Sequence, residues 1–163
     1  MTGSPGRVVA IAGGKGGVGK SLVAANVGIF LATLGKRVIL VDAAFGAPNL
    51  HIFAGVPRPA RSLSEAFTGT PLVDLAVATH VPNVRLIGGV NDPPTTANPS
   101  PDDVAAVARQ LHDLPADWIV VDLGPGLGAP TLDLFLEADI GLIVAVPDPT
   151  SIELMHRFVR AAF

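Results

Sequence analysis

The feature that most constrains the fold of this chain is a glycine-rich segment at residues 14–21, GKGGVGKS. It satisfies the pattern G-x-x-x-x-G-K-[ST], with an apolar run at 7–12 before it and a stretch rich in alanine and leucine at 20–34 after it. Glycines allow successive backbone N–H groups to curl around an anion, and the following helix adds the positive end of its dipole. The segment therefore predicts a phosphate-binding loop between a buried strand and a helix.

The chemistry of this motif assigns a role to its residues. The Lys20 ammonium is expected to neutralise the β- and γ-phosphates of ATP, and the Ser21 hydroxyl to ligate Mg²⁺. Asp122 ends the apolar run WIVVD, and the carboxyl ends of parallel strands face the ligand crevice, so Asp122 can hold a magnesium-bound water. We therefore expect ATP and Mg²⁺ as cofactors, bound by Gly14, Lys15, Gly16, Gly17, Val18, Gly19, Lys20, Ser21 and Asp122.

Short β-branched runs alternate with longer helical stretches along the chain. Strands are predicted at 7–12, 37–42, 84–87, 118–122 and 140–146. Helices are predicted at 20–34, at 62–67, from 102, at 130–138 and from 150 to the end, with a surface loop at 91–101. The near-continuous apolar strands suit a parallel sheet covered on both faces, as do 49% hydrophobic and 15% charged residues. The pattern predicts a doubly wound, mainly parallel α/β sheet with helices on both faces, the Rossmann-like three-layer fold of P-loop NTPases.

Composition and charge exclude several kinds of protein. The chain has no cysteine, which removes disulfides, thiolate metal sites and iron–sulfur clusters. Its net charge of -3 and its scattered basic residues give no sign of nucleic-acid binding by this segment. No apolar run approaches the roughly 18 residues of a membrane span, and residues 1–7 do not resemble a signal peptide. The histidines lie at no metal-ligand spacing. We therefore expect a cytoplasmic protein.

Lys15, at the start of KGGVGKS, resembles the signature lysine of the deviant Walker A motif, which marks the MinD/ParA family of ATPases. Other segments are similar to this family, and together they cover nearly the whole chain from Arg7 onward. They are Asn26 in the helix after the loop, a switch I segment at 42–50, a switch II segment at 122–128 and a strand-to-helix turn at 146–151. The stretch NLHIFAGV at 49–56 looks closest to the MinD-like regulators related to the flagellar-number ATPases.

The resemblance implies a nucleotide-dependent switch. Two ATP-loaded subunits dock face to face in this family, so Lys15 is expected to reach the partner's phosphates, and hydrolysis then separates the subunits. Lys15, Lys20 and Asp42 are the implied catalytic residues, and Asp42 and Asp122 are each implied to contact Mg²⁺ through water, beside Ser21. The protein is expected to form a homodimer in its ATP state and to regulate the spatial positioning or assembly of a protein partner. A segment beyond Phe163 is expected to make peripheral contact with the inner face of the cell membrane.

The sequence departs from the family pattern in two places. Ala44 stands where the family has the second aspartate of switch I, which positions the attacking water, and a methyl group cannot orient water. The chain also stops at Phe163, after about five parallel strands, so residues 1–163 are interpreted as one P-loop NTPase domain truncated at its C-terminus. The remaining strands of the sheet and the adenine pocket are expected to lie beyond that residue.

Two functions of different class therefore stay open. One is a slow ATPase that acts as a spatial or assembly regulator, and the other is a pseudo-ATPase that holds ATP as a binding module without efficient hydrolysis. A metabolic ligase of the same superfamily also stays open. Cluster carriers and nitrogenase-type reductases need thiolate ligands that this sequence lacks. A tyrosine-kinase relative would normally carry a tyrosine cluster, and this chain has no tyrosine.

Overall fold

One sheet organises the part of the chain that the computed structural model describes, residues 6–89 and 98–163. Its strand order is β3-β4-β2-β5-β1-β6, and every neighbouring pair is parallel except β3 with β4. The chain moves outward from β1 to β4, then returns to β5 and crosses β1 to reach β6, which makes the sheet doubly wound. The predicted fold class is therefore confirmed. The strands are β1 Arg7–Ala12, β2 Val38–Ala43, β3 Val77–Ala78, β4 Val84–Ile87, β5 Trp118–Leu123 and β6 Ile140–Ile143.

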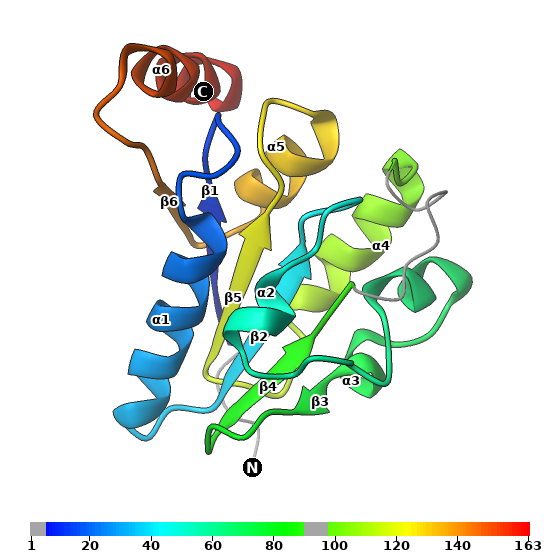
Figure 1. The fold of residues 1–163 in the computed structure, drawn as a ribbon. Coiled ribbons are helices and arrows are strands. Elements are labelled where there is room, and N and C mark those ends of the chain that lie inside the picture. The colour runs from blue at the N-terminus through cyan, green and yellow to red at the C-terminus, as the bar shows by residue number, and fades with distance from the viewer. Residues whose placement is uncertain (1–5, 90–97) are drawn as a thin grey trace.

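Helices cover both faces of this sheet (Figure 1). On one face, buried alanines of α1 pack against side chains of β1, β2 and β5, and Leu50 of α2 joins the same cluster. On the other face, α4, α5, α6 and η1 form a larger cluster, in which the rings of Phe135 and Phe158 meet edge to face. No described helix combines the length and apolarity that crossing a membrane requires. The helices are α1 Lys20–Thr33, α2 Leu50–Phe53, the 3-10 helix η1 Leu63–Thr68, α3 Leu72–Leu75, α4 Pro101–Leu111, α5 Ala129–Leu136 and α6 Pro149–Ala162.

Most predicted boundaries agree with these elements. β1 and β4 have the predicted limits, β2 is shifted by one residue at both ends, and β5 extends one residue further than predicted. The predicted helix at 62–67 is a 3-10 helix shifted by one residue, and the helix predicted from 102 begins at Pro101 because Ser100 caps it. Most of the predicted loop at 91–101 lies outside the described residues.

The prediction of a buried strand at 140–146 was wrong in two respects. β6 ends at Ile143, and both Gly141 and Leu142 are exposed. The reason is its place in the sheet, because β6 pairs with β1 on one side and has no strand beyond it among the described residues. An apolar run therefore marks a strand here, but not a strand covered on all sides.

The sheet brings the predicted site residues to one edge. β1 runs into the glycine-rich loop, while β2 and β5 carry Asp42 and Asp122 near their carboxyl ends. Asp42 and Asp122 are paired across β2 and β5, and Ile11 of β1 lies opposite Asp122. Parallel strands end on the same side, so the loop and both carboxylates meet there.

Candidate functional site

The glycine-rich loop joins β1 to α1 through a backbone that only glycine adopts readily. Gly17 has a φ of 77° and Gly19 a φ of 97°, in the left-handed region that a side chain disfavours. Gly19 is also the residue before α1, and no side chain caps that helix. The first turn of α1 contains no acidic residue either. Its free N–H groups and positive dipole end therefore remain available to an anion.

Lys20 is the first residue of α1, at the end of this loop, and is buried, with 8% of its surface exposed. Its ammonium is 3.4 Å from the backbone carbonyl oxygen of Lys15, which is a long hydrogen bond. Burial lowers the pKa of Lys20, and the negative charge of Asp122 opposes that effect. Within the described residues the ammonium makes no ion pair at salt-bridge distance. A desolvated cation of this kind gains strongly from an anionic ligand.

Asp122 is the most isolated polar group of the site. Its side chain is completely buried, and neither carboxyl oxygen has a hydrogen-bond partner among the described residues. Burial raises the pKa of Asp122 to about 6. The nearby Ser21 hydroxyl, which does not reach hydrogen-bonding geometry, and the Lys20 charge offset only part of that rise. Buried acceptors are normally satisfied, so these oxygens call for a ligand or water.

Asp42 is buried beside Asp122 and is tied to the backbone that follows it. Its carboxyl oxygens accept hydrogen bonds from the N–H groups of Ala44 at 3.2 Å and Leu50 at 2.9 Å. Burial, and then the charge of Asp122, raise the pKa of Asp42 to about 7. Two adjacent buried carboxyl groups disfavour each other's charge, so a cation between them would favour ionisation of both.

The oxygen groups of Ser21, Asp42 and Asp122 fit a magnesium ion. Mg²⁺ prefers hard oxygen ligands, retains several waters, and is usually held by one or two carboxylates together with substrate phosphates. The unpartnered oxygens of Asp122 provide acceptors for such waters. The described residues contain no cluster of three or more His, Cys, Asp or Glu side chains that could hold a metal. A metal held by Ser21 and these carboxylates would share its remaining ligands with water and phosphate.

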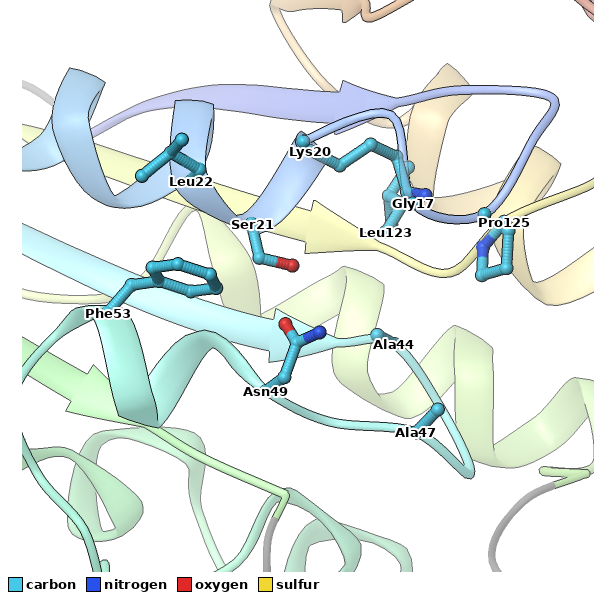
Figure 2. Close-up of a pocket in the computed structure, with 12 residues that line it drawn as sticks. Gly17, Lys20, Ser21, Leu22, Ala44, Ala47, Asn49, Phe53, Leu123 and Pro125 are labelled. Atoms are coloured by element: carbon cyan, nitrogen blue, oxygen red, sulfur yellow. The ribbon is translucent and has the colours of Figure 1, made fainter. Parts of the chain in front are cut away.

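A pocket of about 350 Å³ opens between the glycine-rich loop and the segment after β2. Of the residues predicted to bind nucleotide, five line it, whereas Gly14, Lys15 and Val18 do not, and the carboxylates of Asp42 and Asp122 are buried outside its lining. The segment after β2 closes the opposite side (Figure 2). The pocket is lined by Gly16, Gly17, Gly19, Lys20, Ser21, Leu22, Ala44, Ala47, Asn49, Phe53, Leu123 and Pro125.

Lys15 is turned toward its own chain. Its ammonium lies 3.3 Å from a carboxyl oxygen of Asp148, the N-cap residue of α6, and 3.2 Å from the hydroxyl of Thr150. Hydrogen bonds from the Thr150 hydroxyl and the Ser151 backbone, with a smaller effect of Lys15, lower the pKa of Asp148 to about 2. Sequence reasoning identified the turn at 146–151 but did not predict this contact. In the single chain the Lys15 side chain therefore bridges the loop and the start of α6.

The segment after Asp42 contains little polar chemistry. Ala44 is buried and lines the pocket with its methyl group, and Phe45 packs against Phe67 with 6.1 Å between ring centroids. Figure 2 shows Asn49 as the polar side chain that this segment directs toward Ser21. Sequence reasoning included Asn49 in the switch I segment but gave it no role. Its position in that motif was the signal available.

Comparison with known proteins places these features in a family. Residues 9–162 match the CobQ/CobB/MinD/ParA nucleotide binding domain. The chain is 32% identical over 158 residues to the antiactivator FleN of Pseudomonas aeruginosa, covering 96% of this chain and 56% of FleN. It is 32% identical over 150 residues to the flagellum site-determining protein YlxH of Helicobacter pylori, covering 90% of this chain and 50% of YlxH. The chain thus spans about half the length of these relatives.

A solved structure supports the same assignment. The cell division ATPase MinD of Pyrococcus furiosus superposes with a TM-score of 0.81 at 26% sequence identity, covering 93% of this chain and 64% of that one. The resemblance predicted from Lys15, the switch segments and the stretch at 49–56 is therefore confirmed. This chain belongs to the family of CobQ/CobB/MinD/ParA nucleotide-binding domains.

Proposed function

We propose that this protein binds ATP with Mg²⁺ at the glycine-rich loop and uses the nucleotide as a switch. The observation that carries the proposal is a buried Lys20 ammonium without an ion pair among the described residues, which lines the pocket and interacts electrostatically with the buried, unpartnered Asp122 carboxylate behind it. The loop N–H groups and Lys20 bind the phosphates, while Ser21, Asp42 and Asp122 hold the metal directly or through water. When bound, Mg²⁺ neutralises charge on the phosphates.

Hydrolysis by this site is proposed to be slow. A residue that orients the attacking water typically contributes a factor of ~10²–10⁴ in rate. Ala44 lines the pocket but offers no side-chain acceptor, and the side chains of Ala43 and Phe45 beside it offer none either. The site therefore keeps the groups that bind nucleotide but has a methyl group at position 44 in place of the carboxylate that would orient water. The alanine at position 44 also supports the second candidate function, a pseudo-ATPase that holds ATP as a binding module.

The output of the switch is proposed to be self-association and regulation of a partner. In the ATP state Lys15 leaves Asp148 and reaches the phosphates of a second copy, so the two contacts are alternatives for one ammonium. Relatives described as an antiactivator and a flagellum site-determining protein support a role in positioning or assembly of a protein partner. We further propose that residues 1–163 form one nucleotide-binding domain of a cytoplasmic protein, which contacts the inner membrane face peripherally through another segment.

Two assays on the complete natural protein test this proposal. Equilibrium titration with a fluorescent ATP analogue, with Mg²⁺ and with a chelator, should give saturable binding that the metal strengthens. Single-turnover phosphate release then separates the candidates, because a slow ATPase releases phosphate measurably above the spontaneous rate and a pseudo-ATPase does not. Absence of metal-dependent binding would count against both functions.

A further inference from the structure

Asn49 places an unassigned polar group in the pocket. Its side chain rises from the start of α2 and points across the pocket toward the Ser21 hydroxyl (Figure 2). Asn49 and Ser21 come from opposite walls, one after β2 and the other at the start of α1. The Asn49 amide therefore faces the position where Ser21 is proposed to ligate Mg²⁺.

The Asn49 side chain serves no structural purpose that the described residues reveal. Asparagine at an N-cap normally accepts a hydrogen bond from the helix backbone, and Asn49 is the N-cap residue of α2. Here its side chain forms no capping hydrogen bond, although the position favours one. The amide of this exposed residue is therefore free to contact a ligand in the pocket.

The backbone around Asn49 is fixed to the proposed metal site. The Leu50 N–H donates to the Asp42 carboxylate at 2.9 Å, and the Leu50 side chain is fully buried. The Asn49 backbone N–H also helps to lower the pKa of Asp42. The backbone of Asn49 and Leu50 is therefore tied to Asp42, whose position in β2 is opposite Asp122 in β5.

The other side chains that line the pocket leave Asn49 as a distinctive acceptor. Apart from the glycines, Lys20 and Ser21, the lining side chains are apolar: Leu22, Ala44, Ala47, Phe53, Leu123 and Pro125. Lys20 carries a positive charge and repels a metal ion, whereas an amide oxygen accepts hydrogen bonds from metal-bound water. Mg²⁺ keeps several waters, and each bound water needs such an acceptor.

We propose that the Asn49 side-chain oxygen belongs to the magnesium shell and holds a metal-bound water opposite Ser21. The proposal rests on the proposed function, because it assumes that Mg²⁺ binds with nucleotide at this pocket. Asn49 is thus a positioning residue for the metal and acts through water. The segment around Ala44 has no side chain that orients the attacking water. Asn49, in the same segment, instead orients the metal.

The test is the Mg²⁺ dependence of nucleotide binding in the complete natural protein. A fluorescent ATP analogue is held at fixed concentration while Mg²⁺ is titrated, and the half-saturating Mg²⁺ concentration is recorded. Loss of an outer-shell partner weakens metal binding by ~10–100-fold, so Asn49→Ala should raise that concentration about tenfold. Asn49→Asp, which keeps the shape and an acceptor oxygen, should restore the parent value or a lower one. Nucleotide affinity in chelator should stay unchanged in Asn49→Ala, whereas any loss there in Asn49→Asp should come only from repulsion between its carboxylate and the phosphates.

Asn26→Ala is the matched control, because the exposed Asn26 amide donates to the Leu22 carbonyl oxygen at 2.7 Å within α1. It should leave the half-saturating Mg²⁺ concentration unchanged. An unaltered Mg²⁺ requirement in Asn49→Ala would overturn the proposal, as would an equal loss of affinity in chelator, which indicates damage to α2. A parent protein that binds nucleotide without any response to Mg²⁺, or whose affinity survives Lys20→Ala, would instead refute the proposed function itself.

Discussion

Replacing Asp42 by asparagine should change how the stability of the nucleotide-free protein depends on pH. Burial and the charge of Asp122 raise the pKa of Asp42 from 3.8 to about 7. Between these values the folded state binds more protons than the unfolded chain, so raising the pH lowers the free energy of unfolding. Linkage with this pKa gives a loss of about 2–3 kcal/mol from about pH 5 to about pH 8. The loss is complete once the pH exceeds the folded-state pKa.

The assay is urea unfolding followed by circular dichroism across that pH range, without Mg²⁺ or nucleotide. Asp42→Asn removes the titrating group, and its single amide oxygen can accept from the N–H group of Ala44 or of Leu50 but not from both, a loss that does not depend on pH. The parent should therefore lose about 2–3 kcal/mol more than this variant over the range. Asp113→Asn, at an exposed residue after α4, serves as the control and should follow the parent. Equal pH dependence in parent and Asp42→Asn would refute the claim that Asp42 is held in a desolvating environment.

Three further changes probe the switch and the core. Ala44→Asp should raise the rate of single-turnover ATP hydrolysis by at least about tenfold in the complete natural protein, because it restores a water-orienting carboxylate. A parent protein that already reaches the rate of the variant without a partner would contradict this prediction. Lys15→Ala should abolish ATP-driven dimerisation while the monomer still binds nucleotide. Light scattering with a non-hydrolysable ATP analogue measures the dimer, and nucleotide-independent dimerisation of the parent would count against the switch. Phe158→Ala should lower the free energy of unfolding by about 3–5 kcal/mol in urea titrations, because it leaves a cavity at a fully buried position against Phe135. A change below about 1 kcal/mol would show that α6 contributes little to the core.

The parts of the fold that local sequence determines were predictable. β1, the glycine-rich loop and α1 follow one another in a pattern whose chemistry needs no distant partner, and their limits agree closely with the structure. Gly35, where the chain leaves α1, has a φ of 78°, which explains the predicted stop. Apolar runs likewise identified β4 and β5, because both are flanked by other strands and covered on both faces.

Short elements and distant contacts could not be predicted in the same way. α2 spans Leu50–Phe53, too few residues for helical periodicity, and its start depends on a hydrogen bond from Leu50 to Asp42. β3 consists of Val77–Ala78 and exists only through antiparallel pairing with β4. The limits of β6 depend on its pairing with the neighbouring strand β1, which cannot be predicted from an apolar run alone.

The candidate site shows the same difference between residues that a local motif predicts and contacts that depend on distant parts of the chain. The motif identified Lys20 and Ser21, and the end of an apolar strand identified Asp122; in the structure Lys20 and Ser21 line the pocket, and Asp122 is buried close to both. The contact of Lys15 with Asp148 joins residues 133 positions apart, so no local pattern indicates it. Asn49 lay in a recognised segment, but its orientation toward Ser21 depends on the turn that Asp42 holds.

The most direct test of the central claim is the affinity of the complete natural protein for a fluorescent ATP analogue with Mg²⁺, compared between the parent and Lys20→Ala. Lys20 is the buried cation of the proposed phosphate site, and loss of such a charge-assisted contact costs about 2–3 kcal/mol, or roughly 30–150-fold in Kd. Lys36→Ala, which removes an exposed lysine after α1, should leave the affinity unchanged. A Kd for Lys20→Ala equal to that of the parent, in a protein that still folds by circular dichroism, would contradict nucleotide binding at this loop.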